Sequence, residues 1–149
     1  MTIDQCIRPG AHAHLVGIGG ISMYSLAEIL LERGLTVTGS DTRRSDAVDE
    51  MTAMGIAVTI GHAAVNIGNA DFVVRTAAVH NDNPEVVAAR ERGIPVFERA
   101  QAFGAIMRRY RNAVCVAGTH GKTTTTSMLS SIAMAAGIDP SLMIGGVLP

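Results

Sequence analysis

Lys122 is the only lysine in the chain, whereas the other eleven basic side chains are arginines. It stands between Gly121 and Thr123, directly after an apolar run and a glycine-containing turn. A lysine ammonium is a compact charge that fits between phosphate oxygens, whereas the flat arginine fork favours bidentate contacts. The pattern predicts a loop that holds nucleotide phosphates at the N-terminus of a helix.

This candidate loop is shorter than a full Walker motif, because Val116 stands where that motif has its first glycine. What remains is the segment from Gly118 to Thr124. In such a loop backbone amides cradle the phosphates, the lysine reaches the β- and γ-phosphate oxygens and a threonine hydroxyl can ligate Mg²⁺. The groups that a nucleoside triphosphate site requires are therefore present in the shortened loop.

A second glycine loop lies about a hundred residues earlier. Gly17 and Gly19 match the first two glycines of a dinucleotide-type fingerprint, and Ser22 stands where the third would be. Asp41 follows 24 residues after Gly17, at the end of the next apolar run, where a carboxylate can accept from ribose hydroxyls. These features predict a site for a diphosphate attached to ribose. A tight strand–helix turn without a ligand is the alternative.

Short apolar runs and helical patterns alternate along the chain, and each glycine loop lies between a predicted strand and the helix that follows it. We expect an α/β fold: a Rossmann-like parallel sheet with helices on both faces. The predicted strands cover residues 14–18, 35–39, 56–60, 71–76, 95–97 and 113–117. The predicted helices cover residues 21–33, 46–54, 84–92, 99–109 and 122–136. Asn83 is the predicted N-cap of the third of these helices, with Pro84 at its first position.

A polar stretch over residues 108–112 separates two α/β patterns and is interpreted as a linker. We expect a complete domain over residues 1–110 and, over 111–149, only the first strand–P-loop–helix unit of an ATPase domain. A single strand and helix cannot bury a core of their own. The strand at 113–117 should therefore pack on the first domain, pair with another chain or be poorly ordered.

Composition excludes several classes of protein. The net charge of −1 provides no basic stripe for nucleic acid, and no stretch reaches the ~18–20 apolar residues of a membrane span. The two cysteines cannot form a disulfide framework, and Cys115 is expected to be a small buried hydrophobe. These observations favour a reduced, cytoplasmic protein.

The segment Gly118–Thr126 resembles the ATP loop of the Mur ligases, which build the peptide stem of bacterial peptidoglycan. The resemblance runs from about His14 to Gly146 and involves several further motifs. These are residues 17–23, 39–41, 61–62, 76–78, 82–85 and 88–90.

The resemblance implies a three-domain, ATP-dependent amide ligase acting on UDP-N-acetylmuramate and L-alanine. ATP phosphorylates the muramyl carboxylate, and the amine of L-alanine attacks the acyl phosphate. Carried over by position, the UDP-sugar residues are Gly17, Gly19, Gly20, Ile21, Ser22, Ser40, Asp41, His62, Thr76, Ala77 and Ala78. The ATP residues are Gly118, Thr119, His120, Gly121, Lys122, Thr123 and Thr124, with Lys122 catalytic and Thr123 near Mg²⁺.

Several points stay open. His62 lines the uridine site or is a capping or surface residue, and Arg75 touches a phosphate or points to solvent. Because the central and C-terminal domains would be missing, we expect no turnover by this chain alone. The alternatives are a recycling ligase that attaches a preformed peptide to the same UDP-sugar, a nicotinamide-dependent oxidoreductase, or a non-catalytic nucleotide-binding module.

Overall fold

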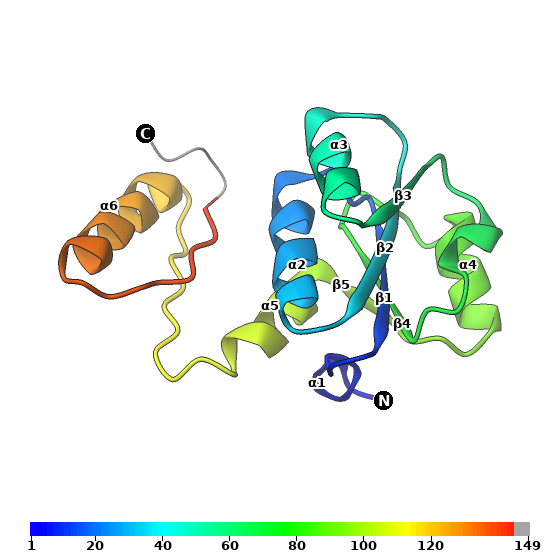
Figure 1. The fold of residues 1–149 in the computed structure, drawn as a ribbon, viewed down its shortest axis with the longest axis horizontal. Coiled ribbons are helices and arrows are strands. Elements are labelled where there is room, and N and C mark those ends of the chain that lie inside the picture. The colour runs from blue at the N-terminus through cyan, green and yellow to red at the C-terminus, as the bar shows by residue number, and fades with distance from the viewer. Residues whose placement is uncertain (145–149) are drawn as a thin grey trace. The chain divides into compact units, whose positions relative to one another are not determined.

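The computed structural model describes residues 1–144, and the chain divides into two compact units, Met1–Tyr110 and a second that begins at Arg111. The last two residues of the family resemblance, 145 and 146, lie outside the described residues. The first unit contains a five-stranded parallel sheet in the order β3-β2-β1-β4-β5 (Figure 1). The strands are β1 His12–Val16, β2 Thr36–Asp41, β3 Ala57–Ile60, β4 Phe72–Arg75 and β5 Val96–Glu98.

Helices cover both faces of this sheet, which confirms the predicted fold class (Figure 1). One face packs against α1 Ile3–Cys6, α2 Ile21–Glu32, α3 Asp46–Ala53 and α5 Arg99–Met107. The other packs against the short 3-10 helix η1 Ala64–Ile67 and α4 Pro84–Glu91. The elements α1 and η1 were not predicted. Asn83 caps α4 as expected, because its Oδ1 accepts from Glu85 N at 2.9 Å.

The strands are buried on both sides because their alternate side chains enter two cores. On β4, Phe72 and Val74 belong to the core under α2 and α5, whereas Val73 belongs to the core under α4. On β1, Leu15 and Val16 divide in the same way. Because both faces of each strand are buried, apolar residues are needed at successive positions, which explains the continuous hydrophobic runs in the sequence.

The strand order reverses at the centre of the sheet. The chain runs outward from β1 through β2 to β3, then returns to place β4 on the other side of β1. The connections after β1 and β4 therefore leave in opposite directions and open a crevice at the carboxyl ends of these strands. The first glycine loop follows β1 and lies at this switch point.

Contacts to α1 tie the end of α5 to the first unit. Arg108 forms an ion pair with Asp4 at 2.6 Å, and Arg109 Nη2 donates to the carbonyl of Ile7 at 2.7 Å. The predicted linker over 108–112 therefore begins too early, since its first two residues are anchored to this unit. Within residues 1–144, no helix has both the length and the apolar character needed to cross a membrane.

The second unit contains α6 Lys122–Ala135, close to the predicted helix, but residues 113–117 do not form a strand. That prediction is wrong in this structure. Val114 is 75% exposed, and Cys115 is exposed rather than buried as we expected. A β-strand needs a neighbouring strand to satisfy its backbone groups, and the part of the chain described offers none here.

Candidate functional site

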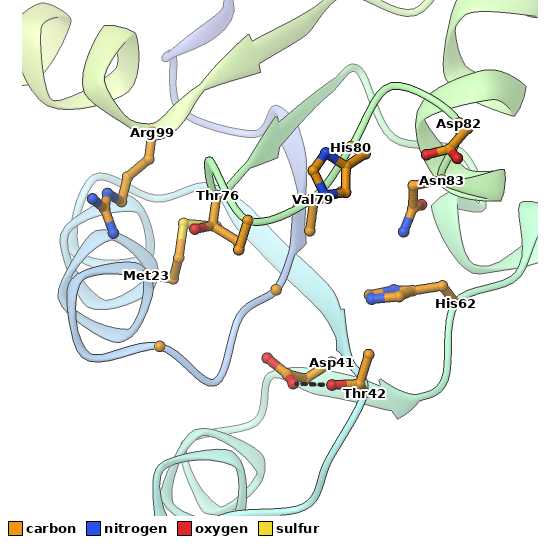
Figure 2. A pocket seen from close by; sticks show the side chains of 13 residues that line it. Met23, Asp41, Thr42, His62, Thr76, Val79, His80, Asp82, Asn83 and Arg99 are labelled. Carbon is orange, nitrogen blue, oxygen red and sulfur yellow. Dashed lines mark hydrogen bonds between the residues drawn. The ribbon is translucent and has the colours of Figure 1, made fainter.

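A pocket of about 480 Å³ lies at the switch point of the sheet (Figure 2). The connections after β1, β2, β3 and β4 all contribute to it, together with the start of α5. Its lining residues are Gly17, Gly20, Met23, Asp41, Thr42, His62, Thr76, Ala78, Val79, His80, Asp82, Asn83 and Arg99.

The pocket brings together six of the eleven residues predicted to hold the UDP-sugar. These are Gly17, Gly20, Asp41, His62, Thr76 and Ala78. The other five do not line the pocket among the described residues: Gly19, Ile21, Ser22, Ser40 and Ala77. Ile21 is 65% exposed, so its apolar side chain points away from the core of the domain as well.

The glycine loop is held by backbone contacts to β2. The N–H groups of Gly17 and Ile18 both donate to the carbonyl of Ser40, at 2.8 and 3.0 Å. Gly17 has a φ of +81°, a left-handed conformation that glycine adopts without steric cost. Gly20 caps the N-terminus of α2 without a side-chain partner. Apart from the amide of Met23, which donates to the Gly20 carbonyl at 2.8 Å, the amides of the first turn of α2 can therefore serve a bound anion.

Asp41 contacts this loop directly. Its Oδ2 accepts from Gly19 N at 2.8 Å, and its Oδ1 accepts from Arg43 N at 3.3 Å. The Gly19 amide, which we expected to face a diphosphate, is thus bonded within the protein. Asp41 shapes the glycine loop and also reaches the pocket wall, where its carboxylate remains beside any bound ligand.

Ser40 does not face the pocket, in contrast to the expectation from the family resemblance. Its side chain is fully buried. The Ser40 hydroxyl donates to Glu85 Oε2 at 2.5 Å, and its oxygen lies 3.0 Å from His62 Nδ1. Ser40 therefore lies behind His62 and connects that ring to a buried carboxylate. His62 itself lines the pocket, which favours a ligand-facing role over a surface role.

Glu85 was given no role from the sequence, where it appeared only as the second residue of a predicted helix and the last residue of the 82–85 motif. Its side chain is fully buried. Burial alone would raise the pKa of the carboxyl, but hydrogen bonds from His14, Ser40 and Asn66 outweigh this effect and lower the pKa to about 2. The carboxylate at the start of α4 is also favoured by the helix dipole. The only signal in the sequence was an acidic residue in the first turn of a predicted helix, which does not by itself indicate burial.

The sequence also gave no reason to choose Arg99, the first residue of α5. In Figure 2 its guanidinium lies on the same side of the pocket as Met23 and Thr76, across from His62 and Asp82. None of the ion pairs between described residues involves Arg99. Its positive charge is therefore available to an anionic ligand.

Arg75, by contrast, is committed to the protein. It donates from Nη1 to the carbonyl of Val79 at 2.5 Å and pairs with Glu98 at 3.2 Å. These contacts brace the connection after β4 against β5. Two roles were left open for Arg75, a contact to phosphate or exposure to solvent. In this structure its guanidinium instead bonds to Val79 and Glu98.

The candidate ATP loop belongs to the second unit. Gly121 adopts a φ of +74° and precedes α6, whose N-terminus has no side-chain cap. Lys122 Nζ donates to the carbonyls of Gly118 and Thr119, at 2.6 and 3.4 Å. Uncapped amides and a nearby ammonium fit a polyphosphate, and Thr123 in the first turn adds a hydroxyl for Mg²⁺. No cluster of three or more His, Cys, Asp or Glu side chains that could hold a metal occurs within residues 1–144.

A parallel sheet with a glycine loop at its switch point defines the class of nucleotide-binding α/β proteins. Within this class, residues 12–111 match the Mur ligase family, catalytic domain, and the chain belongs to that family. Ligases of this family use ATP, and membership sets aside the nicotinamide-dependent oxidoreductase.

Comparison with known proteins shows which members of the family this chain is similar to. UDP-N-acetylmuramate–L-alanine ligase of Lachnospira eligens is 53% identical over 138 residues, which are 92% of this chain and 30% of that protein. The crystal structure of UDP-N-acetylmuramate–alanine ligase from Thermotoga maritima superposes with a TM-score of 0.85 at 34% identity, over 91% of this chain and 32% of that one. A murein peptide ligase from Psychrobacter arcticus gives the same TM-score and identity, over 93% and 29%. The chain thus spans about 30% of the length of the curated relatives that it matches.

Proposed function

We propose that this chain is the UDP-sugar-binding part, with the beginning of the ATP-binding part, of a ligase that joins L-alanine to UDP-N-acetylmuramate. The observation that carries the proposal is the pocket at the switch point, which combines a glycine loop, Arg99 and His62. The names of the relatives at 53% identity supply the substrate class.

The two sides of the pocket suit the two parts of a nucleoside diphosphate. Arg99 and the first-turn amides of α2, beginning after Gly20, provide positive charge and N–H donors for the diphosphate. His62, Asp82 and Asn83 provide polar groups for the nucleoside. This division follows the chemistry of the side chains: the anionic portion of the ligand belongs beside the cation and away from the carboxylate of Asp82.

We propose further that residues Gly118 to Thr124 hold ATP, with Lys122 against its phosphates and Thr123 at Mg²⁺. When bound, ATP supplies the phosphoryl group that activates the carboxylate of the sugar acid. Lys122 would then exchange its present contacts to loop carbonyls for phosphate oxygens, which are stronger partners for an ammonium.

Turnover by this chain alone is not expected. The relatives are about three times as long, and α6 exposes apolar side chains such as Met128 at 61% and Ile132 at 65%. Side chains of this kind on one helix favour a further layer of the same domain above it. The central and C-terminal domains would be the partners of this chain in the working enzyme.

Titration calorimetry tests the proposal. UDP-N-acetylmuramate should bind to the chain, whereas NADH should not. Binding of NADH without binding of the UDP-sugar contradicts the proposal.

A murein peptide ligase is the second candidate, because its structure superposes equally well and it would read the same nucleotide. The sequence identities of the curated relatives favour L-alanine as the second substrate.

A further inference from the structure

The Glu85 carboxylate lies beneath the pocket and collects hydrogen bonds from three parts of the chain. Its Oε2 accepts from Ser40 on β2 and lies 3.4 Å from Nε2 of His14 on β1. Its Oε1 accepts from Asn66 Nδ2 at 2.6 Å and from Ala63 N at 3.3 Å. Because an ionised carboxylate can only accept, each of these partners must point a hydrogen at Glu85.

That requirement determines the proton position on His62. The Ser40 hydroxyl uses its single hydrogen on Glu85, so its oxygen must accept from His62 Nδ1, which is 3.0 Å away. Glu85 Oε1 is also 3.5 Å from the same nitrogen. Nδ1 therefore carries the hydrogen, and the neutral ring presents Nε2 as a lone pair. Figure 2 shows the His62 ring extending into the pocket.

The interior side of the network also supplies a hydrogen to Glu85. His14 is fully buried, and its Nε2 lies 3.4 Å from Glu85 Oε2, so this nitrogen carries a hydrogen. Thr38 Oγ1 lies 2.9 Å from both His14 Nδ1 and His12 Nε2 and links the two rings. No other buried acceptor on this side competes for the Ser40 hydroxyl among the described contacts.

We propose that Glu85 is a positioning residue that acts through Ser40 to hold His62 in its Nδ1–H form, so that Nε2 accepts a hydrogen bond from the nucleoside part of the ligand. The inference rests on the proposed function for the identity of that ligand. A uracil imide N–H and a ribose hydroxyl are the donors that a UDP-sugar can offer. The other titratable groups that line the pocket are Asp41, His80, Asp82 and Arg99. None of them is hydrogen-bonded to His62 Nδ1 among the described contacts.

Nitrogen-15 NMR of the histidine rings tests the proton position without any ligand. The spectra are recorded in alkaline buffer, where imidazoles are neutral, and His62→Ala assigns the signal among the five histidines. We expect the Nδ1–H form in the wild type and a shift towards Nε2–H in Ser40→Ala and Glu85→Gln. Glu91→Gln, an exposed change at the other end of α4, should leave the signal unchanged. An Nε2–H ring in the wild type, or no response to Ser40→Ala, overturns the proposal.

Calorimetry with UDP-N-acetylmuramate tests the consequence for binding. Ser40→Ala leaves Glu85 three of its four donors, and circular dichroism verifies that the variant folds. One lost hydrogen bond predicts an affinity about three- to tenfold weaker. The same change in a His62→Ala background should cost nothing. Equal losses with and without His62 would mean a purely structural role and would overturn the proposal.

Three ligand analogues identify the donor. Loss of the Ser40 effect with N3-methyl-UDP assigns the imide N–H, and its loss with 2′-deoxy-UDP or 3′-deoxy-UDP assigns the corresponding ribose hydroxyl. Retention of the effect with all three contradicts the assignment to the nucleoside. If the wild type binds no UDP-sugar, the proposed function and the ligand role both fail, whereas the NMR comparison still decides whether Glu85 positions His62.

Discussion

The Cα of Gly17 faces the side chain of Thr76 across the pocket floor, and a Cβ on residue 17 would overlap Thr76 Cγ2. Gly17 ends the turn after β1, and Thr76 follows β4, the neighbouring strand. The glycine loop and the β4 connection can approach this closely only because residue 17 has no side chain. The shape of the pocket therefore depends on this pair.

Gly17→Ala should destabilise the first unit by about 2 to 4 kcal/mol, because it adds an overlap with Thr76 to the cost of a left-handed backbone. Gly55→Ala is the matched control. Gly55 has a φ of +89°, but nothing lies within 4 Å of its Cβ position, so only the backbone cost of about 1 kcal/mol applies. Urea unfolding followed by circular dichroism measures both. Similar losses for the two variants would show that Thr76 yields to the extra carbon.

Glu85 should make stability depend on acid pH. Its carboxyl has a pKa of about 2 in the folded protein against an ordinary value of 4.5, so the folded state favours the ionised form. The contribution is complete above the unfolded value and is lost as the pH falls towards 2. The difference corresponds to about 3 kcal/mol. The free energy of unfolding of the wild type should fall over this range more steeply than that of Glu85→Gln. Parallel curves would contradict the prediction.

Arg99→Gln should weaken UDP-N-acetylmuramate binding by about ten- to a hundredfold, because a charge-assisted contact to phosphate is lost. The loss should be smaller for uridine, which has no phosphate. Arg92→Gln removes an exposed arginine at the end of α4 and is the control. Calorimetry at two salt concentrations measures the charge dependence. An equal loss for uridine and the UDP-sugar would place Arg99 beside the nucleoside instead.

Lys122→Met should leave UDP-N-acetylmuramate affinity unchanged. The contacts of Lys122 are to the carbonyls of its own loop, which belongs to the second unit, whereas every pocket residue belongs to the first. The measurement is calorimetry beside the Arg99→Gln variant. A loss of UDP-sugar affinity in Lys122→Met would show that the two sites depend on each other.

The elements that carry the site could be predicted because their signals are local. A buried parallel strand needs a continuous apolar run, a left-handed turn favours glycine, and a helix start favours a residue such as Asn83. Each of these preferences acts within a few residues. The five strands of the sheet and the position of the Gly17 loop followed from them, with boundaries displaced by one or two residues.

The destinations of individual side chains could not be predicted in this way. Ser40 and Asp41 are neighbours, yet Ser40 is buried against Glu85 and Asp41 holds the Gly19 amide. Successive strand residues point to opposite faces, and the partner that each one meets is separated from it by 22 to 45 residues. Arg99 enters the pocket only because α5 begins beside the glycine loop.

Residues 113–117 are a case in which a local strand pattern was present in the sequence but no strand formed. Local sequence preferences account for the apolar segment before the Lys122 loop, which contains Val114 and Val116, and for the glycines, caps and strands of the first unit. Whether such a segment becomes a strand depends on hydrogen bonds to a neighbouring strand, and the residues described provide no neighbour. Tertiary structure alone decided that point and the link from Glu85 to His62, because both depend on contacts between distant parts of the chain.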